Sequence, residues 1–334
     1  MHPSTTPSLV ITLGDPLSIN IKILSKILSE HQPFPTYIVG SYNQWLWQTK
    51  EGPSWCQNLP IFQSFPDQTA EGICFINKEK ELGQGNPKNL TAKKRGIIAR
   101  SALEAIKEVP DNRDLAVLTC PINKKNCHLA GFPFPGQTEY FESIWQGNSI
   151  MIMKGGEMTV GLVTNHLPLK QVVAALSSDL IVSKGMTLLN FLRQRGNDRD
   201  YRIGVCGVNP HAGESGICGT EEGDLIKPAI DKLNQKTSGH FIGPISADTA
   251  FYRCLHGEFD ALLAMFHDQA LTPIKTMYFE EAINITGGLQ HFRCSPDHGP
   301  AADLFDHQQF SIKSMKKSLE ACWDYLFHRQ QKSL

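Results

Sequence analysis

Short apolar runs rich in β-branched residues alternate with longer runs of helical period along most of this sequence. The strand-like runs cover residues 8–14, 36–40, 72–77, 115–119, 149–153, 159–164, 202–208 and 261–266, and the helical runs cover 22–28, 91–109, 222–233 and 311–328. Parallel strands need long crossover connections, usually helices, so this alternation predicts an α/β fold with a largely parallel sheet. Ligands of such sheets lie at the carboxyl ends of the strands, and polar residues found there become site candidates.

The size and charge of the chain narrow its class. Its 334 residues suggest two domains at roughly 100–200 residues each. Lys and Arg total 32 and Asp and Glu total 33, a net charge of −1, so no global field draws the chain to nucleic acid or to an anionic membrane. With 41% apolar and 19% charged residues, the composition is that of a folded globular protein.

No targeting or membrane signal is visible in the sequence. The apolar runs, such as residues 261–266, are far shorter than the ~20 residues of a spanning helix. The first 14 residues carry no Lys or Arg before a short apolar run, which argues against a signal peptide. Nine cysteines, an odd number without CxxC spacing, indicate reduced and mostly buried thiols. We therefore expect a cytoplasmic protein.

Three histidines share one context. His166, His211 and His267 each follow a predicted strand, in the segments TNHLPL, VNPHAGE and MFHDQ. Three imidazoles in one cleft suit Zn²⁺ or another borderline divalent ion, with Asp248 and Asp268 as supporting partners or as a general base. The alternative is that these are surface or capping residues among the twelve histidines, since no short ligand motif such as HExxH is present.

A second group is polar and cationic. Lys275, Asn284 and Arg293 occur at intervals of nine, and alternating strand and turn positions would aim them at one anion. The alternative is that these three residues are separate, solvated surface positions.

A third group is the turn Asp297-His298-Gly299, followed by Pro300 and Ala301 before a helical stretch at residue 302. Backbone N–H groups at a helix N-terminus suit a nucleotide phosphate, although most such turns are only caps. The sequence contains neither GxGxxG nor GxxxxGK[ST].

Long motifs in these segments carry a resemblance to a known family. They are TCPINKKNCHLAGFPFPGQTEYF (119–141), TNHLPL (164–169), GVNPHAGESGICGTEE (207–222), GPISADTAF (243–251), FHDQALTPIK (266–275) and NITGGLQHFRCSPDHGPA (284–301). With them the sequence resembles the 4-hydroxythreonine-4-phosphate dehydrogenase family of pyridoxal phosphate biosynthesis, over residues 11 to about 307.

The resemblance implies the two-domain α/β fold of isocitrate and isopropylmalate dehydrogenases, with an active-site cleft between the domains. We expect residues 1–130 with 295–334 to form the cofactor domain and residues 131–294 to form the metal, substrate and dimer domain. It also implies a homodimer whose active site lies at the subunit interface, with no nucleic acid or membrane partner.

The family pattern also implies the roles of single residues. One divalent metal (Zn²⁺, Mg²⁺ or Co²⁺) would be held by His166 and His211 of one subunit and His267 of the other. The substrate, with its phosphate and carboxylate, would be held by Gln137, Thr138, Lys275, Asn284 and Arg293. NAD or NADP would bind near Asp297, His298 and Gly299.

The implied reaction is oxidation of the 3-hydroxyl of 4-phosphooxy-L-threonine. The metal polarises the hydroxyl, while Asp248, Asp268 or Lys275 takes its proton and NAD⁺ takes the hydride from C3. The resulting β-keto acid loses CO₂ to give 3-amino-2-oxopropyl phosphate.

Two departures from the family pattern stand out. Gln137 replaces a histidine that usually contacts substrate, and glutamine donates hydrogen bonds without carrying charge. The glycine-rich turn GDPAGIGPE reads GDPLSINIK here, so residues 17–22 add side chains where the family has open backbone. Gln290-His291 also replaces the family's Pro-Phe pair.

These departures leave three hypotheses open. The first is the dehydrogenase just described. In the second, which Gln137 motivates, the chemistry is kept but the substrate is another phosphorylated hydroxy acid of the 4-phosphoerythronate type. In the third, which residues 17–22 motivate, the chain is a catalytically impaired descendant that serves as a binding or regulatory protein.

Overall fold

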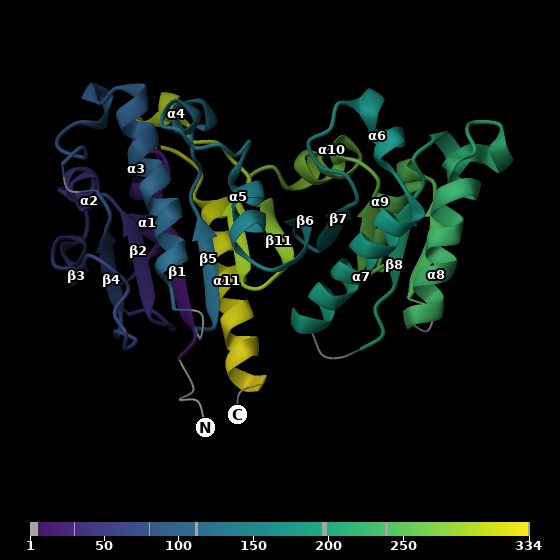
Figure 1. Ribbon diagram of the computed structural model, residues 1–334, viewed down its shortest axis with the longest axis horizontal. Helices are drawn as coiled ribbons and strands as arrows, with labels where there is room; N and C mark the ends of the chain where they lie inside the picture. Colours follow the sequence, from purple (N-terminus) through teal and green to yellow (C-terminus); the bar gives the residue numbers. More distant parts are fainter. Residues whose placement is uncertain are drawn as a thin grey trace. The chain divides into compact units, whose positions relative to one another are not determined.

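The chain folds into two compact units, Met1–Trp145 with His291–Leu334 as unit 1 and Gln146–Gln290 as unit 2 (Figure 1). A computed structural model describes residues 6–29, 31–79, 81–110, 113–195, 199–237 and 240–332. Each unit is an α/β layer structure with its own stretch of sheet, so the predicted fold class is confirmed.

Unit 1 contains an all-parallel stretch of sheet in the order β3-β4-β2-β1-β5-β12. Its strands are β1 (Ser8–Thr12), β2 (Thr36–Gly40), β3 (Ile61–Phe62), β4 (Ile73–Asn77), β5 (Leu115–Thr119) and β12 (Phe292–Pro296). Its helices are α1 (Asn20–Ile27), α2 (Tyr42–Thr49), α3 (Ala92–Glu104), α4 (Lys124–Leu129), α5 (Gln137–Ile144) and α11 (Lys313–Lys332), with 3₁₀ turns at Ser54–Gln57, Pro87–Asn89, Ala105–Glu108 and Ala302–Leu304.

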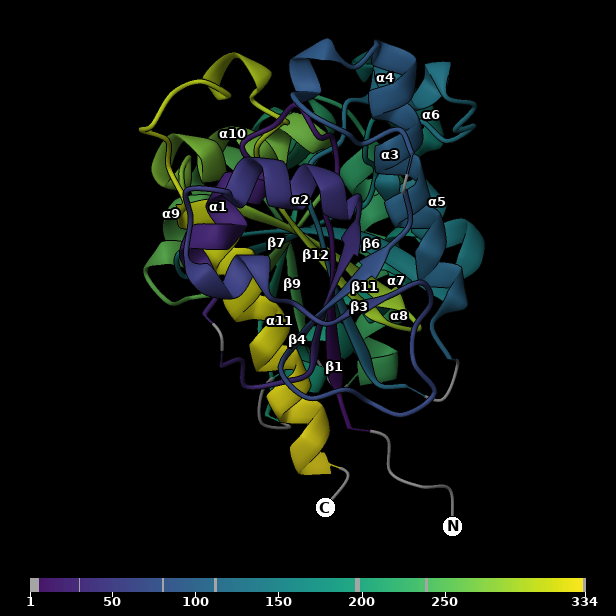
Figure 2. The same ribbon diagram turned by 90° about the vertical axis from the view of Figure 1, so that its left-hand side faces the viewer.

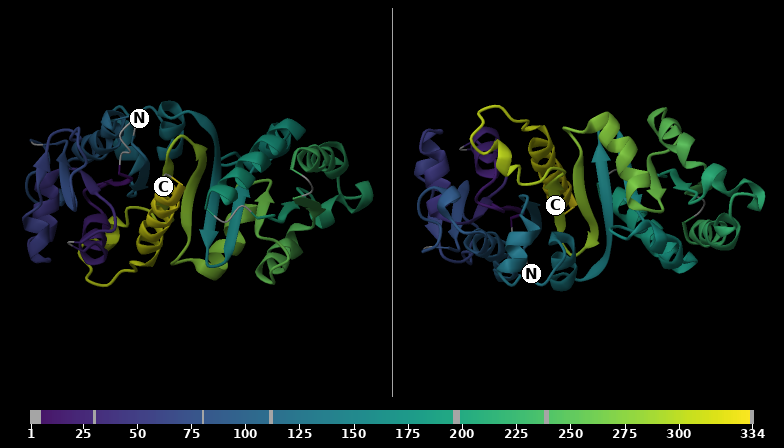
Figure 3. Two further views of the ribbon diagram at one scale, coloured as in Figure 1. Left: turned by 90° about the horizontal axis from the view of Figure 1, so that it is seen from below. Right: turned by 90° about the horizontal axis from the view of Figure 1, so that it is seen from above.

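Helices cover both faces of the unit 1 sheet. Helices α1 and α11 lie on one face and α3 lies on the other (Figures 2 and 3). Strands β1, β2 and β5 are buried along their whole length, as expected of central strands in a doubly covered parallel sheet. Side-chain caps start several of the helices; the Thr91 hydroxyl accepts the Lys94 N–H at 3.3 Å at the start of α3.

Unit 2 contains a mixed stretch of sheet in the order β11-β6-β7-β10-β8-β9. Its strands are β6 (Gly147–Gly155), β7 (Met158–Leu162), β8 (Ile203–Cys206), β9 (Phe241–Ile245), β10 (Ala261–Ala264) and β11 (Ile283–Leu289). Strands β7, β10, β8 and β9 are parallel, whereas β6 is antiparallel to both β7 and β11. Its helices are α6 (Leu169–Ala175), α7 (Ser178–Arg195), α8 (Lys227–Thr237), α9 (Ala247–Leu255) and α10 (His267–Tyr278), with a turn at Pro210–Gly216 and a π-helical turn at Glu222–Ile226.

Several elements differ from the sequence expectation. The expected helix 91–109 ends at Glu104 and continues as the 3₁₀ turn Ala105–Glu108, and the expected helix 222–233 begins with a π-helical turn. Helix α10 occupies residues in which the sequence analysis expected alternating strand and turn positions. The buried Ala270, Leu271 and Ile274 give this segment one apolar helical face, which stabilises the helix.

The unit boundaries fall at 145/146 and 290/291, whereas the sequence analysis placed domain boundaries at 130/131 and 294/295. Helix α5 belongs to unit 1 because the Tyr140 hydroxyl donates to the Leu103 carbonyl oxygen at 3.2 Å and the Tyr140 ring packs on Phe132 and Phe134. The predicted tasks of the two domains, and the predicted cleft, stay predictions.

No single helix in the described part of the chain is long and apolar enough to cross a membrane. Helices α6 and α7, which are bent by 93° at their junction, reach the length and apolar composition of a membrane span only when they are taken together. Helix α7 buries seven of its residues in unit 2.

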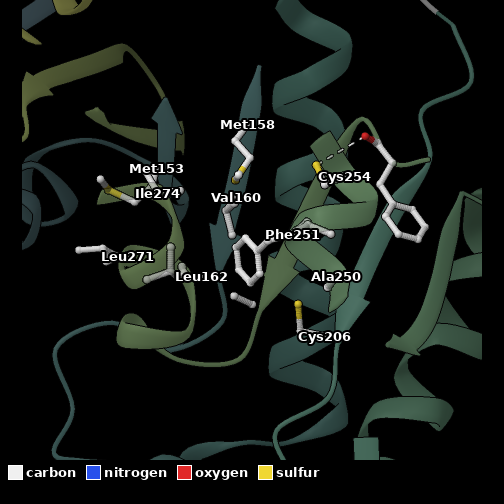
Figure 4. Close-up of a cluster of buried hydrophobic side chains, with 14 of the residues drawn as sticks. Met153, Met158, Val160, Leu162, Cys206, Ala250, Phe251, Cys254, Leu271 and Ile274 are labelled. Carbon is white, nitrogen blue, oxygen red and sulfur yellow. Dashed lines mark hydrogen bonds between the residues drawn. The ribbon is translucent and has the colours of Figure 1, made fainter. Parts of the chain in front are cut away.

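Helices α9 and α10 pack on one face of the unit 2 sheet around a buried apolar cluster (Figure 4). Phe251 of α9 points into this cluster beside Val160 and Leu162 of β7. Gly161, between them, faces Leu188 of α7 on the other side of the sheet, as the period of two in a strand requires. Large side chains on one face and a glycine on the other thus set how closely the two helical layers approach β7.

Truncation of Phe251 tests this core. Phe251→Ala is expected to lower the free energy of unfolding by about 3–5 kcal/mol, because the cavity it leaves is lined by sheet and helix and cannot collapse. The control is Tyr252→Ala, one residue along and 65% exposed, with an expected change below about 1 kcal/mol. Urea denaturation of the two variants measures the difference, and equal losses would contradict the packing described.

Candidate functional site

Three neighbouring parallel strands of unit 2 end beside one another and lead to the three predicted histidines. Strand β10 pairs with β7 on one side and with β8 on the other. His166 lies four residues after β7, His211 five residues after β8, and His267 directly follows Phe266 at the start of α10. Parallel strands place their carboxyl ends at the same edge, so the sheet gathers these three segments on one side of unit 2.

Two of the imidazoles lie close together. The ring centroids of His166 and His267 are 5.4 Å apart, with an angle of 46° between the ring planes. The Nδ1 atom of His267 lies 2.7 Å from Oδ1 of Asp268. A carboxylate on Nδ1 fixes the tautomer and leaves Nε2 as the ligating nitrogen, which is the usual arrangement of a metal-bound histidine.

His211 does not complete a three-ligand group in one chain. Among the described residues of a single chain, no cluster of three or more His, Cys, Asp or Glu side chains could hold a metal ion. The resemblance assigns His267 to the other subunit, whereas the close pair in one chain is His166 with His267. How the ligands divide between subunits stays a prediction.

The turn that carries His211 has an uncommon backbone conformation. From His211 to Ser215 every residue has a positive φ, between 40° and 79°. Four of these five residues are not glycine, and the left-handed region costs roughly 1–2 kcal/mol for each such residue. Such a turn persists only where its surroundings fix it.

Glu222 supplies much of that fixation. Its side chain is buried, and its Oε1 accepts the N–H groups of Val208 and Asn209, each at 2.8 Å. Its Oε2 accepts the side-chain amide of Asn209 at 3.0 Å. A Cβ on Gly213 would lie only 2.6 Å from that Oε2, so the turn needs glycine there both for space and for its φ of +79°. The sequence analysis did not single out Glu222, because its burial cannot be read from the motif GTEE.

Other predicted residues of unit 2 lie on separate elements. Asp248 is exposed in the first turn of α9 and accepts the Ser246 hydroxyl at 2.7 Å. Lys275 lies on α10, about 12 Å along the helix axis from His267. Asn284 lies on β11, and its Oδ1 atom is buried with no hydrogen-bond partner among the described residues. That oxygen is available to accept a hydrogen bond from a ligand.

Arg293 and Thr138, predicted to contact substrate, lie together in unit 1. Arg293 is 3% exposed on β12; its Nε and Nη2 donate to the Thr119 hydroxyl at 3.0 and 2.8 Å, and its Nη1 donates to the Thr138 hydroxyl at 3.3 Å. Burial lowers the pKa of Arg293 to about 10, partly offset by nearby groups that include Glu139. The guanidinium still carries its charge at pH 7, which makes this position suited to an anion. Whether Lys275, Asn284 and Arg293 converge on one anion stays a prediction.

Gln137 begins helix α5 and is held by its amide nitrogen. Its Nε2 donates to the Cys120 carbonyl oxygen at 3.0 Å, which fixes the orientation of the amide. Its Oε1 is buried with no hydrogen-bond partner among the described residues. The side chain therefore presents an acceptor where a phosphate would need a donor.

The predicted cofactor turn contains a half-buried histidine. Nδ1 of His298 lies 2.8 Å from the Gly299 carbonyl oxygen, and burial lowers the His298 pKa, so the neutral ring donates from Nδ1. Its Nε2 is then an acceptor, buried without a partner among the described residues. The following helical stretch is only the 3₁₀ turn Ala302–Leu304, so the expected helix N-terminus is wrong and supplies no extended dipole here.

The altered segment after β1 is closed by its own side chains. The Asn20 amide donates to the carbonyl oxygens of Leu13 and Pro121 at 3.1 and 3.0 Å, and the Ser18 hydroxyl donates to the Asp15 carbonyl oxygen at 2.6 Å. Both side chains are buried, so they fill the inside of the turn. The ammonium of Lys22 donates to the Phe305 carbonyl oxygen. The Asn20 Oδ1 atom is buried with no hydrogen-bond partner among the described residues. The added side chains thus pack within unit 1 but leave one acceptor unsatisfied.

Cys218 lies on the same loop as His211, and the reactivity of its thiol reports how exposed this loop is. Eight of the nine cysteines are buried, and Cys218 is partly exposed. Burial raises the thiol pKa of Cys56, Cys74, Cys120, Cys127, Cys206 and Cys254, to about 11 at Cys56 and Cys254 and to about 12 at Cys127 and Cys206.

We expect one fast thiol per chain in the native protein at pH 8 with a coloured disulfide reagent, since only an exposed thiol ionises readily. All nine should react in denaturant, and Cys218→Ser should abolish the fast phase. Two or more fast thiols in the native protein would contradict the burial described.

Comparisons with known proteins identify the family of the chain. The sequence model of the family described as pyridoxal phosphate biosynthetic protein PdxA matches residues 48–322. The chain is 33% identical over 337 residues to 4-hydroxythreonine-4-phosphate dehydrogenase of Zymomonas mobilis, covering 96% of each chain. It is 32% identical over 299 residues to that enzyme of Sulfurihydrogenibium sp., covering 89% of this chain and 91% of the relative.

Solved structures of enzymes with the same name are similar to this chain over nearly its whole length. The 4-hydroxythreonine-4-phosphate dehydrogenase of Klebsiella pneumoniae is similar with a TM-score of 0.78 and 28% identity, over 97% of this chain and 99% of that chain. A terephthalate 1,2-cis-dihydrodiol dehydrogenase from Burkholderia xenovorans, at 19% identity, TM-score 0.67 and coverage of 95% and 97%, shares the fold. The chain belongs to the pyridoxal phosphate biosynthetic protein PdxA family, whose curated relatives are named as dehydrogenases.

Proposed function

We propose that this protein oxidises the 3-hydroxyl of 4-phosphooxy-L-threonine with NAD⁺ or NADP⁺, followed by decarboxylation to 3-amino-2-oxopropyl phosphate. The relatives just described are named for this phosphorylated hydroxythreonine. The observation that carries the proposal is the His166–His267 pair, with its imidazoles 5.4 Å apart beside the strand end that leads to His211.

The donor set fits one divalent metal. Imidazole nitrogens suit Zn²⁺ or Co²⁺, whereas Mg²⁺ prefers oxygen ligands. His166, His211 and His267 would hold the ion, and the Asp268 carboxylate on Nδ1 of His267 would orient that ring. When bound, the cation would polarise the substrate hydroxyl and lower its pKa.

Each unit by itself offers side chains that suit the substrate's charged groups. The buried guanidinium of Arg293, flanked by the Thr138 hydroxyl, binds phosphate or carboxylate, and Lys275 adds a second cation. The unpartnered Oδ1 of Asn284 accepts a hydrogen bond from a substrate hydroxyl or ammonium group. A substrate that carries two anionic groups and a protonated amine satisfies all of these.

The reaction balances as a loss of hydride and a proton. The proton would leave the 3-hydroxyl for Asp248, Asp268 or Lys275, and a nicotinamide cofactor, when bound, would accept the hydride from C3. Asp268 already bonds His267, so it also serves as an orienting group. In the β-keto acid that results, the C–CO₂ bond breaks, its electron pair passes to the keto group to give an enolate, and the carbon that has lost CO₂ takes up a proton.

The turn Asp297–Gly299 fits a nicotinamide cofactor through His298. The buried Nε2 atom of His298 would accept a hydrogen bond from an amino group, such as that of the adenine or of the nicotinamide carboxamide. We also propose a homodimer that shares its active site and lies in the cytoplasm, where the nine thiols stay reduced.

A steady-state assay tests the proposed reaction. Zn²⁺- or Co²⁺-loaded protein with NAD⁺ and 4-phosphooxy-L-threonine is expected to produce NADH, followed by its absorbance. His211→Ala should lower turnover by at least about 100-fold, since losing a ligand costs more than losing an outer partner. Full turnover in the variant would refute the assigned metal role. No turnover by the wild type, with metal and NAD⁺ still bound, would shift the proposal to another substrate.

The replacement of the family's histidine by Gln137 motivates a second candidate, in which the substrate is a different phosphorylated hydroxy acid of the 4-phosphoerythronate type. The nitrogen of Gln137 is engaged by the Cys120 carbonyl oxygen, and its unpartnered oxygen accepts a hydrogen bond from a hydroxyl group of such an acid more readily than it meets a phosphate. A panel of both acids separates the candidates, because activity on the erythronate alone would establish the second.

Restoring the family's histidine gives a sharper comparison. Gln137→His is expected to lower the KM for 4-phosphooxy-L-threonine about tenfold, because a hydrogen bond to a charged group contributes about 1.5 kcal/mol. Gln68→His, at an exposed position of unit 1, is the control and should leave the KM unchanged. An unchanged KM in both variants would show that residue 137 does not contact the phosphate.

A further inference from the structure

The three strand ends that carry the histidines are linked by a series of hydrogen bonds, and Gln269 stands at its centre. This side chain lies in the first turn of α10, two residues after His267. Its Oε1 accepts the N–H of Met265 at 2.7 Å, and its Nε2 donates to the carbonyl oxygen of Gly207 at 2.7 Å. One amide therefore joins the end of β10 to the end of β8, which is labelled in Figure 1.

Met265 is also held to the segment after β7, through its carbonyl oxygen. The Thr164 hydroxyl donates to the Met265 carbonyl oxygen at 2.7 Å, and the Thr164 N–H donates to that oxygen at 3.2 Å. His166 lies two residues beyond Thr164, and His267 lies two residues beyond Met265. This linkage accounts for the closeness of the His166 and His267 rings.

On its other side, Gln269 reaches the segment that leads to His211. Gly207 directly precedes Val208 and Asn209, whose N–H groups bond the buried Glu222. The hydrogen bond to the Gly207 carbonyl oxygen thus holds the base of the left-handed turn, while Glu222 holds its next two residues. Both ends of the linkage are short bonds to main-chain atoms, so side-chain rotation cannot loosen them separately.

We propose that Gln269 is a positioning residue, which fixes the segments carrying His166, His211 and His267 of one chain at the edge of its sheet before any metal binds, whichever subunit's ion each imidazole holds. The inference rests on the proposed metal site and adds the residue that preorganises it. Gln269 touches neither a histidine ring nor a reacting atom by any bond described above, so it acts through the main chain.

The chemistry at this position requires an amide. A carboxylate would keep the bond to the Met265 N–H but would face the Gly207 carbonyl oxygen with another acceptor. An apolar side chain of the same length would leave both main-chain groups without their partner. The position corresponds to the third residue of a helix, from which Glu or Gln commonly reaches back to a preceding N–H, but only Gln also supplies a donor.

Metal titration of the full-length apoprotein tests the role. Gln269→Glu is expected to bind Zn²⁺ about 10- to 100-fold more weakly than the wild type, as is usual for loss of an outer partner of a metal site. Gln269→Met, which adds no charge, should show a loss in the same range. Gln235→Glu, at an exposed position of α8, makes the same chemical change away from the site and should bind like the wild type.

A second readout separates positioning from general stability. The visible absorption of bound Co²⁺ reports the ligand geometry, and we expect it to shift in Gln269→Glu and Gln269→Met but not in Gln235→Glu. Thermal unfolding of the apoproteins shows whether each variant is folded at the temperature of titration, and Gln269→Met carries the test if the half-buried carboxylate of Gln269→Glu prevents folding. Wild-type affinity and spectrum in a folded Gln269 variant would overturn the inference. A wild-type protein that binds neither Zn²⁺ nor Co²⁺ would instead overturn the proposed metal site.

Discussion

The pairing of β10 between β7 and β8 is the constraint from which the candidate site follows. Parallel pairing brings three carboxyl ends to one edge, and each of those ends continues into a segment with one histidine. The buried apolar cluster between the sheet of unit 2 and helices α9 and α10 holds these strands in place. Imidazoles 101 residues apart in sequence, those of His166 and His267, therefore meet without a local ligand motif.

The site stores backbone strain in one place and offsets it by buried polar contacts in another. The left-handed run from His211 to Ser215 is unfavourable for its non-glycine residues. Glu222 offsets this by accepting three hydrogen bonds from residues 208 and 209. Because the carboxylate is buried, these charge-assisted bonds are strong, and they would be lost together if the turn relaxed.

Much of this arrangement follows from the sequence, and what does not has a clear physical reason. Strand ends were predictable because buried parallel strands read as short apolar runs, and the polar residue that ends each run marks the edge. The hydrogen bond from Gln269 to Gly207 could not be predicted, because it joins residues 62 positions apart and leaves no local pattern in the sequence. The left-handed turn was equally hidden, because only Gly213 in it favours positive φ. Helix α10 is the opposite case. The sequence shows its single apolar face, but the regular spacing of Lys275, Asn284 and Arg293 favoured strand and turn positions instead.

The two departures from the family pattern leave the same kind of atom behind. After β1, the Asn20 Nδ2 donates to two carbonyl oxygens and its bulk occupies the inside of the turn, while its buried Oδ1 has no hydrogen-bond partner among the described residues. Gln137 is arranged in the same way, because its nitrogen is satisfied by the Cys120 carbonyl oxygen while its buried Oε1 is not. An unsatisfied acceptor disfavours a phosphate oxygen and favours a hydroxyl or amine donor. Each departure thus adds one buried acceptor, and residues 20 and 137 are therefore where the ligand preference of this chain is expected to diverge from that of its relatives.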